Sequence, residues 1–276
     1  MKRSVPVDLD QRRFDLAIIG GTGLYRFEGI EATERLTVET PYGATSDAVV
    51  VGRLGSARIG FLARHGEAHD VAPHRVNYRA NVWALHSLGA RRVIGVNAVG
   101  GITQAMGPRV LAVPDQLIDY TDGRLSSYSD APGVKVRHID FSEPYSASLR
   151  RALLAAATAA GIAVVDGGTY GATQGPRLET VAEIARMARD GCDVVGMTGM
   201  PEAALARELG FTHHDPRVNA VLAIPPTPDC VRAGRGRSRS RRTSDSRRRA
   251  SAGHRASRDR RACRGGRAGR TRGRPD

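Results

Sequence analysis

The sequence Asp-Leu-Ala-Ile-Ile-Gly-Gly-Thr-Gly at residues 15–23 decides the fold class. Its first six residues form a short apolar run, which is typical of a buried strand, and a glycine turn follows at once. Glycines allow the backbone to approach an anion closely, and Thr22 adds a hydroxyl donor. Taken alone the motif is weak, because a merely structural tight turn accounts for it about equally well.

Similar apolar runs recur along the chain, and segments with helical spacing lie between them. The further runs are at residues 58–63, 93–97, 110–113 and 192–197. The helical segments are at residues 147–160, 178–189 and 201–209. Strands that alternate with helices predict a single α/β domain, in which helices flank a mixed, largely parallel central sheet.

The formal net charge of +14 is concentrated in one segment. Residues 231–276 hold 18 Arg and three Asp, whereas residues 1–230 hold 24 basic and 25 acidic residues. From Arg232 onward there is no Leu, Ile, Val, Phe, Tyr, Trp or Met, so this stretch has no side chains to form a core. We therefore expect a folded domain at 13–224 and a disordered, Arg-rich tail at 225–276.

Two interpretations of the tail are open. It is either a segment that binds nucleic-acid phosphates, or the out-of-frame translation of a GC-rich gene. The complete absence of Lys from residues 231–276 favours the second, since a selected basic tail usually mixes Lys with Arg. Nucleic acid is therefore expected as a partner only through the tail.

The rest of the composition points to a cytoplasmic protein. The three cysteines, Cys192, Cys230 and Cys263, have neither the spacing of a disulfide framework nor that of a metal knuckle. The first residues contain no apolar core of signal-peptide length. No stretch approaches the ~18–20 apolar residues of a membrane span, so no membrane partner is expected.

A second candidate for chemistry is Phe-Leu-Ala-Arg-His-Gly at 61–66. A strand that ends in Arg64 and His65 brings a fixed cation and a titratable donor to a strand's carboxyl end, where open α/β sheets bind ligands. The planar guanidinium of Arg64 suits bidentate binding of phosphate, although a lone pair of this kind is more often a surface Arg and a packed His. A metal site with His69 and His74 is disfavoured by the loose spacing.

Three further motifs lie at the ends of strands or helices. Val-Asn-Ala-Val-Gly-Gly at 96–101 is a strand that ends in small residues, and Gly-Met-Thr-Gly-Met-Pro-Glu at 196–202 turns from a strand into a helix N-terminus that favours an anion. Thr-Gln-Gly-Pro-Arg-Leu-Glu-Thr at 173–180 has a carboxylate and an amide suited to the edge of a heterocycle. Its plainer interpretation is a capping box formed by Thr180 and Glu183. Any one strand end with groups that suit phosphate could occur by chance, but four of them in one chain are much less expected.

Together the motifs resemble those of the purine nucleoside phosphorylase and methylthioadenosine phosphorylase family. The resemblance runs from about Leu16 to Gly210, and the stretches 97–102 and 178–209 are most similar to the bacterial S-methyl-5'-thioinosine phosphorylases. It implies a homotrimer that uses inorganic phosphate as co-substrate, with no metal and no organic cofactor. The implied reaction converts S-methyl-5'-thioinosine to hypoxanthine and 5-methylthioribose 1-phosphate in purine salvage. Methylthioadenosine and inosine or guanosine stay open as substrates.

The resemblance also implies roles for individual residues. Four side chains match the family's phosphate site and would hold phosphate: Thr22, Arg64, His65 and Thr198. The backbone at Asn97 and Ala98 would help them. Met197 would pack under the ribose, and Glu179 would face the purine and favour a 6-oxopurine. His138 would reach the 5' group from a neighbouring subunit. No catalytic acid or base is assigned.

The match to the family ends near residue 210. The family's base-side Asn or Asp lies in a strand that corresponds to about 219–223, and an apolar helix then closes the pocket. Asn219 is out of register by a residue or two, and Arg-rich sequence stands where that helix would be. We therefore give Asn219 no base-side role and expect the domain to lack this strand and helix.

Two other classes of protein are weighed against the phosphorylase. A dinucleotide-dependent dehydrogenase would also begin with a glycine-rich turn, but Arg26 stands in place of its third glycine and Glu39 is only loosely placed to grip a ribose. A nucleic-acid-binding protein would act through the Arg-rich tail and would lose binding steeply with salt.

Overall fold

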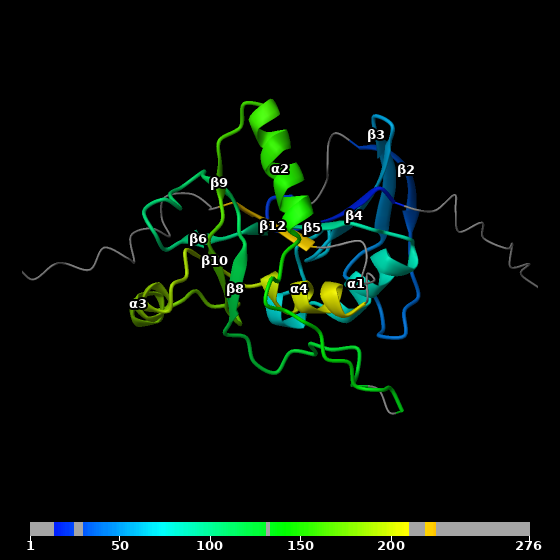
Figure 1. Ribbon diagram of the computed structural model, residues 1–276. Coiled ribbons are helices and arrows are strands. Elements are labelled where there is room, and N and C mark those ends of the chain that lie inside the picture. The colour runs from blue at the N-terminus through cyan, green and yellow to red at the C-terminus, as the bar shows by residue number, and fades with distance from the viewer. Residues whose placement is uncertain (1–13, 25–29, 131–132, 210–218, 225–276) are drawn as a thin grey trace, which may run out of the picture. The chain divides into compact units, whose positions relative to one another are not determined.

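The structure is a computed structural model that describes residues 14–24, 30–130, 133–209 and 219–224, the last of these as backbone only (Figure 1). The expectations of a disordered tail at 225–276 and of nucleic-acid contact through it lie outside these residues. None of the helices in the described ranges has the length and apolar character that a membrane span needs.

The larger of two sheets has eight strands in the order β2-β3-β4-β1-β5-β12-β7-β9. Their bounds are β1 (Leu16–Gly20), β2 (Glu31–Leu36), β3 (Val49–Leu54), β4 (Ala57–Ala63), β5 (Val93–Ala98), β7 (Leu111–Val113), β9 (Val164–Asp166) and β12 (Asn219–Ile224). The central strand β1 pairs in parallel with β4 and β5, and β5 pairs in parallel with β12. The pairs β2–β3, β3–β4 and β7–β12 are antiparallel.

The smaller sheet has four strands in the order β6-β11-β10-β8. Their bounds are β6 (Gly100–Gly101), β8 (Gln116–Asp119), β10 (Thr169–Ala172) and β11 (Val194–Gly196). The chain passes from β5 in the large sheet to β6 in the small one with only Val99 between them. A Cβ on Gly101 would lie 1.7 Å from the carbonyl oxygen of Met106. The expected mixed, largely parallel α/β domain is thus confirmed, with its strands divided between two sheets.

Among the described residues, four α-helices accompany the sheets: α1 (Tyr78–Ser87), α2 (Ala147–Ala159), α3 (Val181–Arg189) and α4 (Gly199–Glu208). Helix α2 lies on one side of the large sheet, and α1 and α4 lie on the other (Figure 1). The helix expected from residue 178 begins only at Val181, because Thr180 is its N-cap. The Thr180 hydroxyl accepts the Glu183 N–H, and the Glu183 carboxylate accepts the Thr180 N–H, so the predicted capping box is confirmed.

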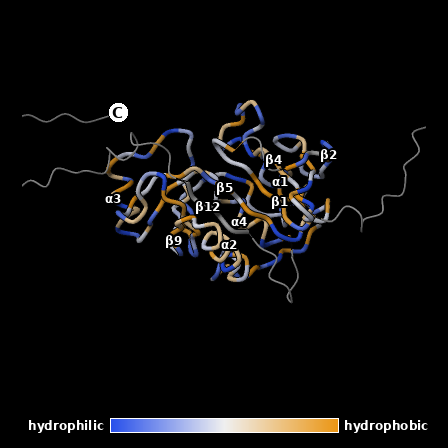
Figure 2. Tube along the Cα trace, turned by 90° about the horizontal axis from the view of Figure 1, so that it is seen from above, coloured by the Kyte–Doolittle hydropathy of each residue, from blue (hydrophilic) through white to orange (hydrophobic). Residues whose placement is uncertain are grey.

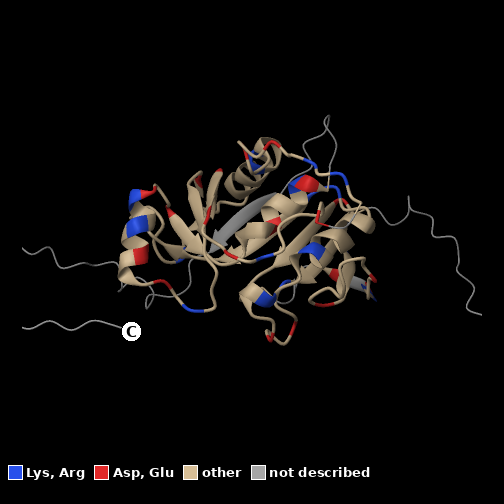
Figure 3. Ribbon diagram, turned by 90° about the horizontal axis from the view of Figure 1, so that it is seen from below, with Lys and Arg blue, Asp and Glu red and all other residues tan. Residues whose placement is uncertain are grey.

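The core follows the alternation of residues along the central strands. Ala17 and Ile19 of β1 pack with Leu205 of α4 and its neighbours on one face, whereas Ile18 packs with Leu149 of α2 on the other. Figure 2 shows hydrophobic residues along these strands, and Figure 3 shows acidic and basic residues interspersed over the described part of the chain. Both faces of the large sheet are therefore covered by helices.

The expectation that the domain lacks a strand near 219–223 is wrong. Residues Asn219–Ile224 form β12, whose backbone pairs with β5 from Asn219 opposite Val93 to Ile224 opposite Ala98. The run Asn-Ala-Val-Leu-Ala-Ile is apolar and long enough for a strand buried between two neighbours. The expectation that the domain also lacks the helix that closes the pocket in the resembled family concerns residues after Ile224, which lie outside the described ones.

Candidate active site

A cavity of about 1170 Å³ lies where the carboxyl ends of β1, β4, β5 and β11 meet. Seven of the nine predicted site residues line it: Thr22, Arg64, His65, Ala98, Glu179, Met197 and Thr198. They come from four separate strand ends and from the loop before α3. The structure thus brings these motifs together at one cavity, while the role of each residue stays a prediction.

The other two predicted site residues lie outside the lining. Asn97 is 1% exposed and stands directly behind Thr198, whose hydroxyl is 2.9 Å from Asn97 Oδ1. His138 is exposed in the irregular segment between β8 and α2 and does not line the cavity of its own chain. Its expected reach into a neighbouring subunit stays a prediction.

Arg64 is completely buried, and its guanidinium group faces a carboxylate of the protein. Its Nε is 2.8 Å from Glu202 Oε2 and its Nη2 is 2.9 Å from Glu202 Oε1, while Nη1 donates to the carbonyl of Val96 at 3.0 Å. Nη2 also approaches the Ile19 carbonyl at 3.4 Å. Of the five N–H donors of a guanidinium, one on Nη1 is left for a ligand. In this arrangement Arg64 offers a ligand one N–H rather than the two of a bidentate contact, and its binding of phosphate stays a prediction.

The charge of Arg64 is secured by its partner. Burial disfavours the charged guanidinium, but the Glu202 carboxylate outweighs this and raises the pKa of Arg64 above its usual value. The pair as a whole carries no net charge. Arg64 therefore presents no free positive charge to this part of the cavity, which offers a ligand individual N–H and O–H dipoles instead.

Gly21 makes room for this arrangement. A Cβ at this position would lie 2.7 Å from Arg64 Nη1 and 2.5 Å from the Val96 carbonyl oxygen. Both distances are shorter than side-chain carbons tolerate, so any larger residue would push the guanidinium out of place. The second glycine of the turn thus has a packing role that is separate from binding an anion.

His65 has a fixed tautomer. Its Nδ1 is 2.8 Å from the carbonyl oxygen of Val71, and because a carbonyl only accepts, Nδ1 carries the hydrogen. Burial lowers the pKa of His65, and the nearby Arg64 and His69 lower it further, against the opposing effect of the Val71 hydrogen bond. The ring is therefore neutral at pH 7, and Nε2 is an acceptor. It suits the O–H of a hydrogen phosphate rather than a bare oxyanion.

The amide of Asn97 has a donor without a partner. With Oδ1 toward Thr198, the buried Nδ2 makes no hydrogen bond within the described part of the chain. The Thr198 hydroxyl then donates its hydrogen bond to Asn97 Oδ1. With the amide turned over, Nδ2 donates to Thr198 Oγ1, and the Thr198 hydroxyl can then donate its own hydrogen bond to a ligand. An anion in the cavity would favour this second arrangement, because it then receives the Thr198 hydrogen bond.

The N-terminus of α4 is partly satisfied from within. The hydroxyl of Tyr170 lies 3.4 Å from the Thr198 N and 3.3 Å from the Gly199 N. Tyr170 is fully buried, and it was not singled out from the sequence. The free N–H groups expected at this helix start are therefore fewer than the sequence suggested.

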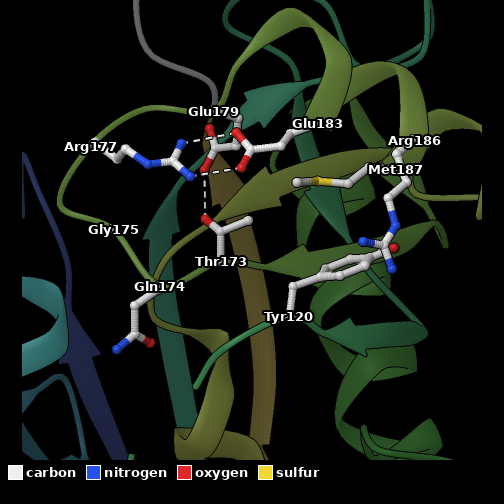
Figure 4. A pocket seen from close by; sticks show the side chains of 9 residues that line it. All are labelled: Tyr120, Thr173, Gln174, Gly175, Arg177, Glu179, Glu183, Arg186 and Met187. Atoms are coloured by element: carbon white, nitrogen blue, oxygen red, sulfur yellow. Dashed lines mark hydrogen bonds and ion pairs between the residues drawn. The ribbon is translucent and has the colours of Figure 1, made fainter. Parts of the chain in front are cut away.

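Glu179 stands between the large cavity and a second one of about 440 Å³. The Thr173 hydroxyl donates to Glu179 Oε1 at 2.6 Å, and Figure 4 shows these two side chains pointing toward one another. Arg177 and Glu183 face each other in the same view, with both guanidinium nitrogens Nη1 and Nη2 bonded to the carboxylate. Thr173 therefore holds Glu179 in one orientation, and Arg177 is occupied elsewhere.

Within the described ranges, no three side chains of His, Cys, Asp and Glu are grouped so as to hold a metal ion. Glu202, Tyr170 and a further arginine, Arg124, are the site residues that sequence reasoning missed. Glu202 stands in one of the quoted motifs, but a glutamate in the first turn of a helix gives no sign in the sequence of a buried partner.

Comparison with known proteins gives a consistent result. Residues 15–213 match the family model described as the phosphorylase superfamily. A probable S-methyl-5'-thioinosine phosphorylase of Xanthomonas campestris is 59% identical over 209 residues, which are 76% of this chain and 81% of that protein. The S-methyl-5'-thioadenosine phosphorylase of Mycolicibacterium smegmatis is 50% identical over 195 residues, which are 70% of this chain and 71% of that protein.

Solved structures agree with these relatives. The crystal structure of a methylthioadenosine phosphorylase from an Antarctic soil metagenomic library has a TM-score of 0.73 to this chain at 37% identity, and the match covers 80% of this chain and 75% of that one. The fold is therefore that of a nucleoside phosphorylase. On the family model, the sequence relatives and the fold together, the chain belongs to the phosphorylase superfamily.

Proposed function

We propose that the protein splits S-methyl-5'-thioinosine with inorganic phosphate, in purine salvage. The observation that carries the proposal is one cavity with two chemically different sides. Thr22, Arg64, His65 and Thr198 supply donors and one acceptor for phosphate, while Met197 and Glu179 supply an apolar surface and a carboxylate for the nucleoside. The Xanthomonas relative, named a probable S-methyl-5'-thioinosine phosphorylase, supports the choice of substrate.

The proposed reaction uses neither a metal nor an organic cofactor. A phosphate oxygen forms a bond to the anomeric carbon of the ribose as the glycosidic C–N bond breaks. The bonding electrons leave with the purine, which takes up a proton from the solvent and is released as hypoxanthine. Phosphate is a modest nucleophile, so most of the acceleration comes from holding it beneath that carbon. The sugar gains oxocarbenium character on the way, and the bound anion stabilises it.

The state of Glu179 favours a 6-oxopurine. One carboxylate oxygen already accepts the Thr173 hydroxyl, and the group has further lone pairs for one more donor. A 6-oxopurine presents an N1–H donor there, whereas adenine presents an N1 lone pair that would face the carboxylate. Methylthioadenosine and inosine or guanosine are the alternative substrates.

We also propose a homotrimer in the cytoplasm. An exposed segment supports the assembly, because His138 and the exposed apolar side chains of Leu125, Val134 and Val136 occur together between β8 and α2. A neighbouring copy would cover these side chains, and His138 would then reach that copy's cavity toward the 5' group. The buried free thiol of Cys192 accords with a reducing compartment. Sedimentation would give the mass of the assembly, and a monomer would count against this part.

The deciding experiment is phosphate-dependent release of base from three nucleosides: S-methyl-5'-thioinosine, S-methyl-5'-thioadenosine and inosine. We expect hypoxanthine from the first at the highest kcat/KM, with no release when phosphate is omitted. Faster release of adenine from the second would transfer the proposal to that substrate. Release from none of them would overturn the proposed activity for this chain.

A further inference from the structure

Arg124 is a half-buried arginine in the connection that follows β8, and it bonds to the backbone of two segments, one after β10 and one after β11. Its Nη1 lies 2.8 Å from the Met197 carbonyl and 2.5 Å from the Met200 carbonyl. Its Nη2 lies 3.2 Å from the Thr173 carbonyl and 2.8 Å from the Gln174 carbonyl. Four backbone oxygens are thus held by one guanidinium.

These carbonyls belong to neighbouring strand ends. Thr173 and Gln174 follow β10, and Met197 follows β11 and leads into α4, while Arg124 itself follows β8. The three strands are adjacent in the small sheet. Arg124 therefore fixes the spacing between the loop that carries Glu179 and the turn that carries Met197 and Thr198.

The side chain of Gln174 completes the network. Its Oε1 accepts the Nε of Arg124 at 3.0 Å and the backbone N–H of Asp122 at 3.2 Å. All five N–H donors of the guanidinium are therefore engaged. A lysine has three donors at a single point and reaches the same carbonyls at most in part.

Tyr78 of α1 supports the guanidinium from another side. Arg124 Cζ lies 5.4 Å from the centre of the Tyr78 ring, and Nη1 is 3.3 Å from the Tyr78 hydroxyl. Burial raises the pKa of Tyr78, so the phenol stays neutral, and it donates to the carbonyl of Pro73, a residue that lines the cavity. The ring restricts the guanidinium to one plane.

We propose that Arg124 is a positioning residue for the nucleoside half of the site, which rests on the function proposed above. It touches neither phosphate subsite nor reacting atoms. It acts by holding Glu179 and Met197 at the separation that the purine and ribose require. On the phosphate side, Arg64 and His65 make none of the contacts of Arg124, and only Thr198 stands on the turn that Arg124 holds. Loss of Arg124 should therefore affect the nucleoside more than the phosphate.

The test compares Arg124→Lys and Arg124→Met with the unchanged chain. We expect the KM for the nucleoside to rise about tenfold or more, as the loss of one or two hydrogen bonds to a charged group would give, while the KM for phosphate rises much less. Arg150→Lys is the matched control. Arg150 also donates to two backbone carbonyls, those of Val113 and Pro114. Neither of these residues lines the cavity, whereas Met197 does, so both constants should stay unchanged.

Calorimetric titration with hypoxanthine adds a measurement that does not depend on turnover, and the midpoint of thermal unfolding shows whether each variant is folded. A folded Arg124→Lys chain that binds hypoxanthine as the unchanged chain does would overturn the inference, as would an equal rise of both KM values. Absence of phosphorolysis in the unchanged chain would instead overturn the proposed function. In that case the hypoxanthine titration still decides the role of Arg124.

Discussion

Arg64 and Glu202 meet in the interior as a pair joined by two hydrogen bonds of 2.8 and 2.9 Å, although 138 residues separate them along the chain. Both side chains are almost completely shielded from solvent, at 0% and 1% exposure. The pair connects the end of β4 to the first turn of α4. The pair determines how many N–H donors of Arg64 remain for a ligand in the cavity.

Removal of one member of this pair should destabilise the protein strongly. Glu202→Leu would leave the Arg64 charge buried without a partner, which costs about 3–5 kcal/mol of the free energy of unfolding. The double variant Arg64→Met with Glu202→Leu removes both charges and should recover most of that loss. Urea unfolding of the single and double variants measures both quantities. A double variant no more stable than Glu202→Leu would contradict this reading of the pair.

The strand ends that form the cavity could be predicted because each is a local signal. The runs at β1, β4, β5, β7 and β11 are apolar, and small or charged residues follow each of them in the sequence. The pattern therefore indicates both the strand and the place where it ends. Strand β2 reads Glu-Ala-Thr-Glu-Arg-Leu, which suits an edge strand but lacks an apolar run. Strand β6 is only two glycines long and has no pattern at all.

The contacts that arrange the site could not be predicted in this way. Arg64 meets Glu202, and Arg124 meets Met197 73 residues later, across distances in sequence that no periodicity encodes. A planar guanidinium suits a phosphate and a carboxylate equally well, so the residue type alone left the partner of Arg64 undecided. The burial of both partners settles it in favour of the carboxylate.

Asn97→Asp should weaken phosphate binding through Thr198. A carboxylate at this position can only accept, so it would keep the Thr198 hydroxyl proton that an anion in the cavity needs. We expect the KM for phosphate to rise about tenfold or more, and the KM for the nucleoside to change much less. Steady-state kinetics with each substrate varied in turn measures the two constants.

Thr198→Val and Thr198→Ser are the matched controls for this effect. The valine variant lacks the hydroxyl and should resemble Asn97→Asp, whereas the serine variant keeps it and should stay within about threefold of the unchanged chain. If Asn97→Asp raised the phosphate KM in the Thr198→Val background as much as in the unchanged chain, the amide would not act through Thr198.

Glu179→Gln should narrow the preference for 6-oxopurines. An amide can accept from the N1–H of hypoxanthine or donate to the N1 of adenine, whereas a carboxylate can only accept. The ratio of kcat/KM for methylthioinosine to that for methylthioadenosine should fall about tenfold or more. Glu183→Gln is the control, since Glu183 is bonded to Arg177 and does not line the larger cavity. A ratio that falls equally in both variants would place the selectivity elsewhere.

His65 should make the stability of the protein depend on pH. Burial first, and then the charges of Arg64 and His69, lower its pKa below the ordinary value of 6.5, so the unfolded chain binds the imidazole proton more tightly than the folded chain does. The contribution of His65 to the free energy of unfolding is therefore complete above about pH 6.5 and is lost as the pH falls toward the folded-state pKa. Urea unfolding from pH 5 to pH 8 in a phosphate-free buffer measures it, with His65→Gln for comparison. The difference in stability between the two chains should be constant above pH 7.5 and should shift in favour of His65→Gln as the pH falls below 6.5. A difference that stays constant over the whole range would show that the ring of His65 titrates in the folded protein as it does in the unfolded chain.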